Sequence, residues 1–212
     1  MRSEIETNSF VPSEFFGDID IYLFDQILKN RFSPEMKILD AGCGGGRNLI
    51  YFLHQKFPIF GVDQNPEAVQ SIRRLAQTLA PEILPENFQI SPVETMPFEN
   101  ETFDWVLSNA VLHFADDETH FDKMLQEMWR VLKPSGKLFA RLASTIGIED
   151  KVEKIAERRF LLPDGSERFL VDEAMLVKTT DRLGGIFVEP IKTTNVQNLR
   201  CMTTWIIAKT NS

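Results

Sequence analysis

Apolar and polar positions along this chain follow two alternating patterns. Short apolar runs are typical of buried strands, and apolar residues spaced about three and four apart are typical of helices. The first pattern predicts strands near residues 37–40, 58–62, 87–91, 103–108, 136–142, 186–193 and 202–209. The second predicts helices at about 47–55, 66–80, 117–132, 149–160 and 172–183. Strands that alternate with helices favour a mainly parallel sheet covered on both faces, which is an α/β fold.

The segment from residue 38 to residue 48 carries the clearest chemical signal. Its apolar run ends in Asp40, and three glycines follow on alternate positions: Gly42, Gly44 and Gly46. Glycine permits a positive φ and lets a ligand approach the main chain. The free N–H groups at the start of the next helix attract negative charge. The pattern therefore predicts a buried strand, a tight turn that holds a small ligand, and the start of a helix.

A dinucleotide is the first candidate ligand, because its fingerprint is also a glycine-rich turn after a strand, Gly-x-Gly-x-x-Gly. Counted from Gly42, the third glycine of that fingerprint would fall at position 47, which is Arg47. Gly46 comes one residue too early, and the fingerprint does not ask for an acid before the first glycine. A nicotinamide-dependent oxidoreductase therefore matches the turn less well.

The spacing Asp-x-Gly-x-Gly-x-Gly, which begins at Asp40, instead resembles the first motif of class I S-adenosylmethionine-dependent methyltransferases. Three later segments resemble further motifs of that family in the same order: residues 57–63, 103–114 and 132–138. The resemblance covers residues 37–143 and is thinner from 144 to 209. It implies a Rossmann-like, doubly wound seven-stranded sheet, mainly parallel with one antiparallel strand near the C-terminus. It also implies S-adenosyl-L-methionine as the cofactor.

The resemblance assigns cofactor contacts to two acids and to the turn between them. In the family the acid that matches Asp40 organises the turn and reaches the methionine part of the cofactor. Cys43 lies inside the turn as a small packed residue. Asp63 stands 21 residues after Gly42, where a carboxylate accepts both ribose hydroxyl protons, and Gln64 follows it. A turn without a ligand is the alternative for the glycines, and a helix cap is the alternative for Asp63.

Residues 92–98 depart from the family where it holds adenine. Val93 and Glu94 fall at the adenine-binding positions, but Pro92 stands where an Asp usually accepts from the adenine amino group. We expect the Val93 N–H to donate to the ring. Glu94 is a candidate acceptor in place of the missing Asp, and the alternative is a solvated loop carboxylate.

Three further residues fall at the methionine end of the cofactor. Asn109, directly after the fourth strand, is expected to accept from the cofactor ammonium through a backbone carbonyl. His113 is either a general base for the acceptor or a packing residue under the cofactor, since its ordinary pKa near 6.5 suits proton removal. Arg47 opens a helix where the dipole disfavours a cation, so it is expected to pair with the cofactor carboxylate. Arg47-Asn48 also resembles the tellurite and thiopurine methyltransferase subgroup.

Composition narrows the class of protein. The chain has 212 residues and a net charge of −8, from 23 basic and 31 acidic residues. No basic run provides the cationic face of a general nucleic-acid binder, and no apolar run is long enough to predict a transmembrane helix. The first seven residues are polar and do not read as a signal peptide. Two cysteines, Cys43 and Cys201, fit a reducing compartment, so a cytoplasmic protein without a membrane partner is expected.

One methyltransferase domain is expected over residues 1–212. Its parts are an N-terminal cap (1–36), the cofactor-binding core (37–143), a lid insertion (144–171), and a closing helix with an antiparallel strand pair (172–212). Asp164-Gly165 within the lid predicts a hairpin or tight turn. The aromatic and apolar content of the cap and lid predicts an apolar or aromatic cavity for a small-molecule substrate.

The predicted reaction is an in-line displacement of methyl from the sulfonium by a small-molecule acceptor. This chemistry needs the reactants held in near-attack geometry and no enzyme nucleophile. Residues 108–111 lack the Asn/Asp-Pro-Pro-aromatic motif of adenine-N6 or glutamine-amide methylases. The alternatives are a methyltransferase of protein or RNA, and a non-catalytic module that binds S-adenosylmethionine.

Overall fold

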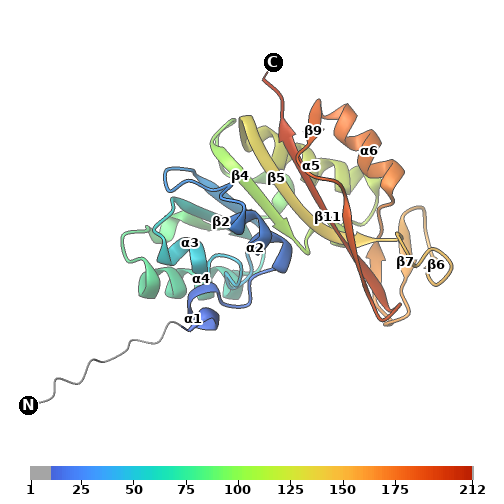
Figure 1. The fold of residues 1–212 in the computed structure, drawn as a ribbon, viewed down its shortest axis with the longest axis horizontal. Helices are drawn as coiled ribbons and strands as arrows, with labels where there is room; N and C mark the ends of the chain where they lie inside the picture. Colours follow the sequence, from blue (N-terminus) through green and yellow to red (C-terminus); the bar gives the residue numbers. More distant parts are fainter. Residues whose placement is uncertain (1–10, 212) are drawn as a thin grey trace, which may run out of the picture.

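Seven strands form one continuous sheet in the computed structural model, which describes residues 11–211 (Figure 1). The strands are β1 (Ile38–Ala41), β2 (Ile59–Asp63), β3 (Phe88–Ile90), β4 (Phe103–Asn109), β5 (Leu132–Ser144), β10 (Lys192–Val196) and β11 (Arg200–Lys209). Their order across the sheet is β3-β2-β1-β4-β5-β11-β10. The first five strands pair in parallel, and β11 runs antiparallel to β5. The predicted fold class is therefore confirmed.

The C-terminal strands differ from the prediction of one strand over 186–193. The structure has a short β9 (Gly185–Phe187), paired with the end of β11, and then β10 after a gap. Pro190 lies in that gap. Because proline has no N–H to donate to a ladder, it interrupts the strand there.

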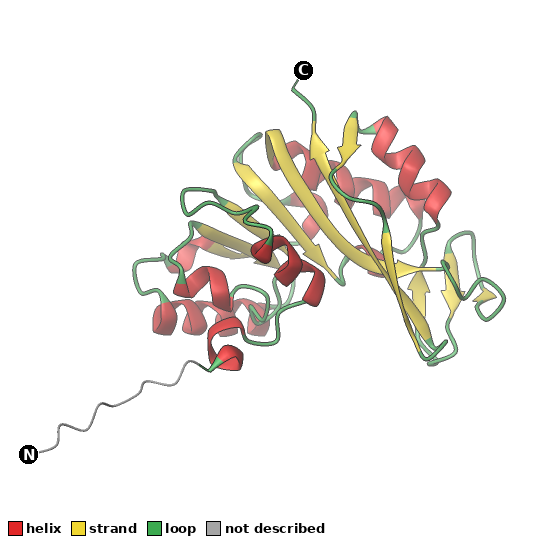
Figure 2. Cartoon of the chain, in the orientation of Figure 1, coloured by secondary structure: helices red, strands yellow, loops and turns green. Residues whose placement is uncertain are grey.

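Helices cover both faces of the sheet (Figure 2). They are α1 (Pro12–Phe16), α2 (Ile21–Leu28), α3 (Ile50–His54), α4 (Pro66–Leu79), α5 (Glu118–Val131) and α6 (Glu173–Arg182). The side chains of α2, α3 and α4 pack in one apolar cluster with residues such as Leu23, Phe52 and Ile72. Those of α5 and α6 pack in a second cluster on the other face, with Met128 and Leu176. The helices α3, α4, α5 and α6 agree with the amphipathic pattern, except that α3 begins three residues later than predicted. The helices α1 and α2 were not predicted.

The lid segment 144–171 was predicted to contain a helix over 149–160, and that prediction is wrong. Three short strands stand there instead: β6 (Glu153–Lys154), β7 (Arg159–Leu161) and β8 (Glu167–Phe169), which form a separate antiparallel sheet. The segment is rich in helix-forming residues, but a short helix needs a buried apolar face, and Ile155 remains 49% exposed. The predicted turn at Asp164-Gly165 is confirmed, since it joins β7 to β8 and Gly165 has φ +80°.

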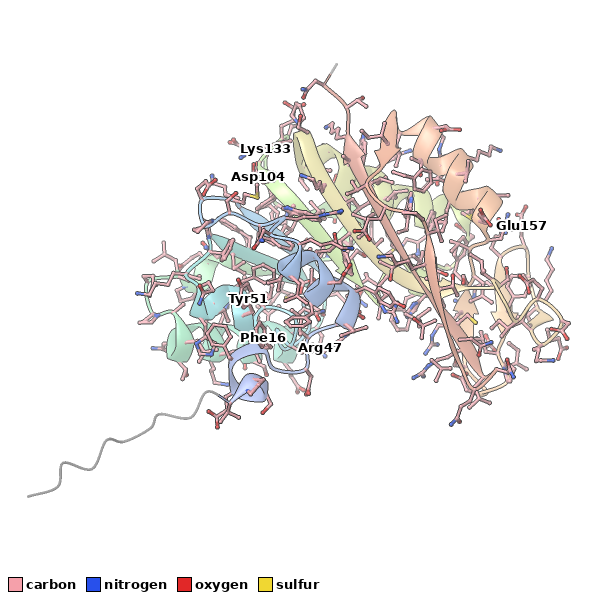
Figure 3. All side chains as sticks on the ribbon, in the orientation of Figure 1. Phe16, Arg47, Tyr51, Asp104, Lys133 and Glu157 are labelled. Carbon is pink, nitrogen blue, oxygen red and sulfur yellow. The ribbon has the colours of Figure 1, made fainter. Side chains whose placement is uncertain are left out.

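The small sheet adjoins the carboxyl end of β5, where Ser144 bridges to Val171. At the opposite, amino-terminal ends of the parallel strands, Lys133 and Asp104 form an ion pair at 2.9 Å. Figure 3 shows Arg47 far from that pair, toward the other ends of the strands. Ligands of open α/β sheets bind at the carboxyl ends of the strands, and the residues predicted to bind the cofactor gather there.

Asp20 fixes the N-terminal segment to the sheet at the carboxyl ends of the strands. Its Oδ1 accepts from the N–H groups of Tyr22 and Leu23 and so caps α2. Its Oδ2 lies 2.7 Å from Nε of Arg141 on β5, and both side chains are 10% exposed. Arg141 also donates to Thr204 Oγ1 at 3.0 Å. One carboxylate therefore starts a helix and neutralises a buried guanidinium.

We expect Asp20→Asn to lower the free energy of unfolding by about 2–4 kcal/mol, because Arg141 would keep a buried charge without its counter-charge. Asp20→Ala is expected to lose about 1 kcal/mol more, since it also removes the helix cap. Urea unfolding at neutral pH measures both. Asp18→Ala removes an exposed carboxylate two residues away and should leave the midpoint unchanged. Equal midpoints for Asp20→Asn and the wild type would contradict the role of the pair.

Candidate active site

The turn after β1 requires glycine at three positions, for two different reasons. Gly42, Gly44 and Gly46 all have positive φ, at +83°, +52° and +87°. A Cβ on Gly42 would lie 2.4 Å from Val111, and one on Gly46 would lie 2.1 Å from Ile72. A Cβ on Gly44 would meet nothing within 4 Å. The outer two glycines therefore allow the turn to pack, and the middle one faces open space that a ligand can fill.

Asp63, at the end of β2, holds this turn in place. Its Oδ2 accepts from the Gly44 N–H at 2.9 Å, and its Oδ1 accepts from the Asn65 N–H at 2.9 Å. A carboxylate has about four acceptor positions, so both oxygens can still accept from ligand hydroxyls. Asn65 caps α4 through the Glu67 N–H. Asn65, and not Asp63, therefore caps α4.

Three buried polar atoms without a hydrogen-bond partner lie at the ends of β1 and β4. Within residues 11–211 they are the only side-chain atoms of this kind: Asp40 Oδ1, Ser108 Oγ and Asn109 Nδ2. β1 and β4 are neighbours, with Asp40 paired to Leu107 in the register. Buried polar groups in folded proteins are nearly always partnered. Asp40 Oδ1 and Asn109 Nδ2, which the register places on one face at the ends of neighbouring strands, are therefore an acceptor and a donor that a polar ligand can partner.

Burial raises the pKa of Asp40 to about 7 from its ordinary 3.8. The positive charge of Arg47 opposes this rise, and the negative charge of Asp63 adds to it. Asp40 is 2% exposed. A buried carboxyl that titrates near neutral pH is poised to gain from a cationic ligand, since a positive charge beside it favours the ionised form.

Two cavities open on either side of Ala110. The first has a volume of about 270 Å³, and its walls include predicted cofactor residues: Gly42, Asp63, Gln64, Val93 and Glu94. Pro92, Val111, Phe114, His120 and Met124 complete it. Glu94 Oε1 lies 3.7 Å from His120 Nε2. The position of Pro92 in this wall means that the departure from the family's adenine contact falls inside the cavity.

The second cavity has a volume of about 310 Å³ and brings together parts of the chain that are distant in sequence. Asp20 comes from the N-terminal segment, Arg141 and Ala143 from β5, and Arg200 and Met202 from β11. The turn between β7 and β8 contributes Leu162, Asp164, Ser166 and Arg168. Arg47, Asn109, Ala110 and His113 form the side that adjoins the first cavity.

The lining of this second cavity differs from the apolar or aromatic one predicted. The aromatic residues of the N-terminal segment pack on α3 instead. Phe16 stacks on Tyr51 with ring centroids 5.4 Å apart (Figure 3). Tyr22 lies against the Arg141 guanidinium at 4.7 Å. The aromatic side chains of the N-terminal segment therefore hold that segment in place, and charged side chains line the cavity.

Arg47 and Asn109 bridge the junction between the cavities. Arg47 Nη2 donates to Asn109 Oδ1 at 2.9 Å, and its Nη1 donates to the Asp18 carbonyl at 2.9 Å. Ala110, the next residue, has φ +62° and donates its N–H to the Arg141 carbonyl. The contacts of Arg47 also explain why the turn runs on to residue 49 before α3 begins.

His113 is 5% exposed and its ring orientation is fixed by one hydrogen bond. The Ala143 N–H donates to His113 Nδ1 at 3.2 Å, so the proton of the neutral ring is on Nε2. Burial, and then the positive charges of Arg168 and Arg200, lower the pKa of His113 to about 4. The ring is therefore neutral at pH 7 and presents a donor rather than an acceptor at Nε2.

Four of the residues predicted to bind the cofactor line neither cavity, namely Asp40, Cys43, Gly44 and Gly46. Cys43 is buried against Gly61, where a Cβ would come 2.9 Å from its Sγ, and burial raises the pKa of its thiol. Gly46 packs against Ile72 on α4. The sequence analysis missed Arg141 and Arg200, which only tertiary folding brings to the second cavity. From the sequence, Arg168 is one of the lid arginines that could attract an anionic substrate, with a solvated surface as the preferred alternative, and the structure places it in the cavity wall. Ala110 and Phe114 belonged to a loop already matched to the family and could have been found there.

The described residues hold neither a candidate metal site nor a helix that could cross a membrane. No group of three or more His, Cys, Asp or Glu side chains among residues 11–211 could hold a metal ion. None of the helices in that part of the chain is long and apolar enough to cross a membrane.

Comparison with known proteins agrees with the geometry. Residues 39–140 match the family model described as a methyltransferase domain. The uncharacterized methyltransferase YodH of Bacillus subtilis (strain 168) is 38% identical over 122 residues, which are 58% of this chain and 46% of that protein. The chain spans about half the length of the curated relatives it matches. Residues 39–140 are therefore similar to a methyltransferase domain, and the relative YodH is named as a methyltransferase.

Solved structures share the fold over most of the chain. A 1,6-didemethyltoxoflavin-N1-methyltransferase of Burkholderia thailandensis, with bound 1,6-didemethyltoxoflavin and S-adenosylhomocysteine, has a TM-score of 0.65 at 21% identity. The match covers 87% of this chain and 76% of that one. The cyclase SpnF has a TM-score of 0.66 at 15% identity and covers 90% and 81%. None of these proteins is named as a tellurite or thiopurine methyltransferase, so that subgroup stays a prediction.

The buried Asp40 gives a pH-dependent prediction for the ligand-free protein. Its pKa is raised on folding, so the folded state binds this proton more tightly than the unfolded state does. The free energy of unfolding is therefore reduced as pH rises from about 4 to about 7, by on the order of 2–4 kcal/mol. Asp40→Asn should be more stable than the wild type by that amount near pH 8 and similar to it near pH 4. Urea unfolding at the two pH values measures the difference, and a pH-independent difference would contradict it.

Proposed function

We propose that this protein transfers a methyl group from S-adenosylmethionine to a small-molecule acceptor. The observation that carries the proposal is the pair of buried, unpartnered polar atoms Asp40 Oδ1 and Asn109 Nδ2, at the ends of the neighbouring strands β1 and β4. A cofactor with an ammonium, a carboxylate and a sulfonium supplies partners for such atoms. The similarity of residues 39–140 to a methyltransferase domain family supports the same reading.

The residues of the first cavity and of the turn fit this cofactor. Asp40 would attract the ammonium and sulfonium charges, and Arg47 would hold the carboxylate. Asp63 would accept from the ribose hydroxyls while it continues to hold Gly44. Val93 and Glu94 would contact the adenine, in a cavity whose wall also includes the exposed Pro92. Cys43, Gly46 and Gln64 would contribute through the shape and main chain of the loops.

S-adenosylmethionine supplies a methyl group on a sulfonium, which is an excellent leaving group. The chain therefore needs only to hold the acceptor in line and to exclude water. The second cavity meets the first at Ala110, whose small side chain leaves room for the reacting atoms. We place the acceptor in that second cavity, whose volume of about 310 Å³ suits a small molecule.

His113 is best assigned as a hydrogen-bond donor to the acceptor. Its Nδ1 already accepts from the Ala143 N–H, and its pKa is lowered to about 4. A general base is most efficient when its pKa lies near the working pH. The base role, which the sequence left open, is therefore the weaker of the two for this ring, and a soft or anionic acceptor would need no base.

The cap and lid predicted from the sequence have a structural basis in this cavity. Asp20 from the first segment and Arg168 from the second both line it. We propose a single domain in which residues 11–36 and 144–171 choose the acceptor. Residues 1–10 of the predicted cap lie outside the described residues, as does the N-terminal stretch judged not to be a signal peptide.

The cellular location and the partners remain predictions. The cytoplasmic prediction rests on Cys43 and Cys201, which are both free and buried. The acidic net charge of −8 supports a small molecule over a nucleic acid. Methylation of protein or RNA is the alternative that an acceptor screen would reveal.

A second function is favoured by one specific comparison. SpnF, named as a cyclase, shares this fold over 90% of the chain, so the fold alone does not fix the reaction. A module that binds the cofactor without methyl transfer is therefore the second candidate. Release of S-adenosylhomocysteine with an acceptor panel supports the enzyme, and cofactor binding without turnover of any acceptor supports the module.

Asp63→Ala tests the cofactor site directly. We expect it to weaken S-adenosylmethionine binding by about 1.5–3 kcal/mol, the scale of hydrogen bonds to a charged group. Isothermal titration calorimetry measures the dissociation constant. Glu67→Ala, which removes an exposed acid in the first turn of α4, serves as the control and should bind as the wild type does. An unchanged constant for Asp63→Ala would remove this residue from the site.

His113→Asn tests the donor role through its pH profile. The ratio of wild-type to variant kcat/KM should stay constant between about pH 5.5 and 8, because a ring with its pKa near 4 does not titrate there. A thiol acceptor found by screening for S-adenosylhomocysteine release is suitable, since its own titration cancels in the ratio. A ratio that rises through pH 6–7 would restore the base role.

A further inference from the structure

The second cavity has more positive than negative charge in its walls. Four arginines line it, namely Arg47, Arg141, Arg168 and Arg200, against two carboxylates, Asp20 and Asp164. His113 is the other titratable group in the wall and is neutral at pH 7. The wall of the second cavity therefore carries two more positive than negative charges.

Two of the arginines form ion pairs with the two carboxylates. Arg141 Nε lies 2.7 Å from Asp20 Oδ2, in a pair of nearly buried side chains. Arg200 Nη1 lies 3.7 Å from Asp164 Oδ2, and Asp164 is itself held by the N–H and the hydroxyl of Ser166. This leaves Arg47 and Arg168.

Arg47 belongs to the cofactor side of the cavity. It is tied to Asn109 at the junction with the first cavity, and the proposed function gives it the cofactor carboxylate. Arg168 has no such partner. Its Nη1 donates to the carbonyl of Glu167 at 2.7 Å, and its guanidinium lies 4.9 Å from the ring of Phe114. Neither contact neutralises its charge. The carboxylate of Asp164 attracts Arg168 as well as Arg200, but its ion pair is with Arg200.

The charge of Arg168 is directed into the cavity. Phe114 is 55% exposed and also lines the first cavity, so the guanidinium on its ring lies close to the junction. Phe114 also contacts the ring of His113, at 4.6 Å between ring centroids. Burial is the largest cause of the lowered pKa of His113, and the positive charge of Arg168 lowers it further. Arg200 acts on His113 in the same direction. An unneutralised, partly buried cation in a concave site is a recognition element for an anion.

We propose that the methyl acceptor carries an anionic group, a carboxylate or a phosphate, and that Arg168 binds it with help from Arg200. This inference rests on the proposed function, because it places the anion of the acceptor rather than that of the cofactor at Arg168. The predicted apolar or aromatic substrate is thereby replaced by one with a charged end. The rest of the acceptor reaches toward Ala110, where the reacting atoms meet.

The test measures binding of three probes that differ only in their polar group: benzoate, phenyl phosphate and benzamide. The protein is first saturated with S-adenosylhomocysteine, so that the carboxylate partner of Arg47 is already present. We expect benzoate or phenyl phosphate to bind at least about tenfold more tightly than benzamide, the scale of one charge-assisted contact. Whichever anion binds more tightly identifies the group.

Arg168→Gln should weaken binding of the anion by about tenfold and leave benzamide unchanged. Arg200→Gln should have a smaller effect, because Asp164 already shares its charge. Arg74→Gln is the matched control, since Arg74 is an exposed arginine on α4 outside both cavities. Thermal unfolding of each variant separates a lost contact from a lost fold.

The inference is overturned if benzamide binds as tightly as the anions, if no anion binds, or if Arg168→Gln binds them as the wild type does. Titration with S-adenosylhomocysteine alone separates this failure from that of the proposed function. If the homocysteine compound binds and the anions do not, only the acceptor class is wrong. The probes are also titrated without it, so Arg168 is tested even if the proposed cofactor site fails.

Discussion

The hydrogen bond from the Gly44 N–H to Asp63 is the contact on which the whole site depends. It ties the turn after β1 to the end of β2, with Gly44 in a left-handed conformation over open space. If the turn relaxed, the space beside Gly44 would close, and Asp40 would lose its position under it. The parallel sheet supplies rigidity here, because β1 and β2 are paired along their whole length.

Asp40 shows that the site is arranged for binding and not for stability. An apolar residue at the end of β1 would pack without penalty, whereas this carboxyl is buried with one oxygen unpartnered. If Asp40 holds the cationic end of the cofactor, as proposed, binding would recover the free energy that folding loses there, and occupancy of the site would be coupled to stability. Asn109 at the end of β4 would add to the same coupling, since its unpartnered atom also awaits a polar contact.

The sequence predicted the turn and the positions of both acids because local rules determine them, and it predicted the class of the sheet from the alternation of strands and helices and from the family resemblance. Positive φ and close packing demand glycine at 42 and 46, and an acid at the end of a strand is visible without a structure. The strands of 153–169 and the charged cavity could not be predicted in this way. Helix-forming residues at 149–160 had no apolar face to bury, and the pairing of Arg141 with Asp20 joins residues 121 positions apart. Which arginine remains without a carboxylate depends on that pairing.

The two cavities touch only through Ala110, which lines both. The walls on the far side of Ala110 come largely from hairpin tips and the N-terminal segment, whereas the glycine turn is set by β1, β2 and α4. New acceptor preferences can therefore arise in descendants of this gene by changes at the hairpin tips, with the donor half inherited intact. A bulkier side chain at position 110 would separate the two cavities from each other.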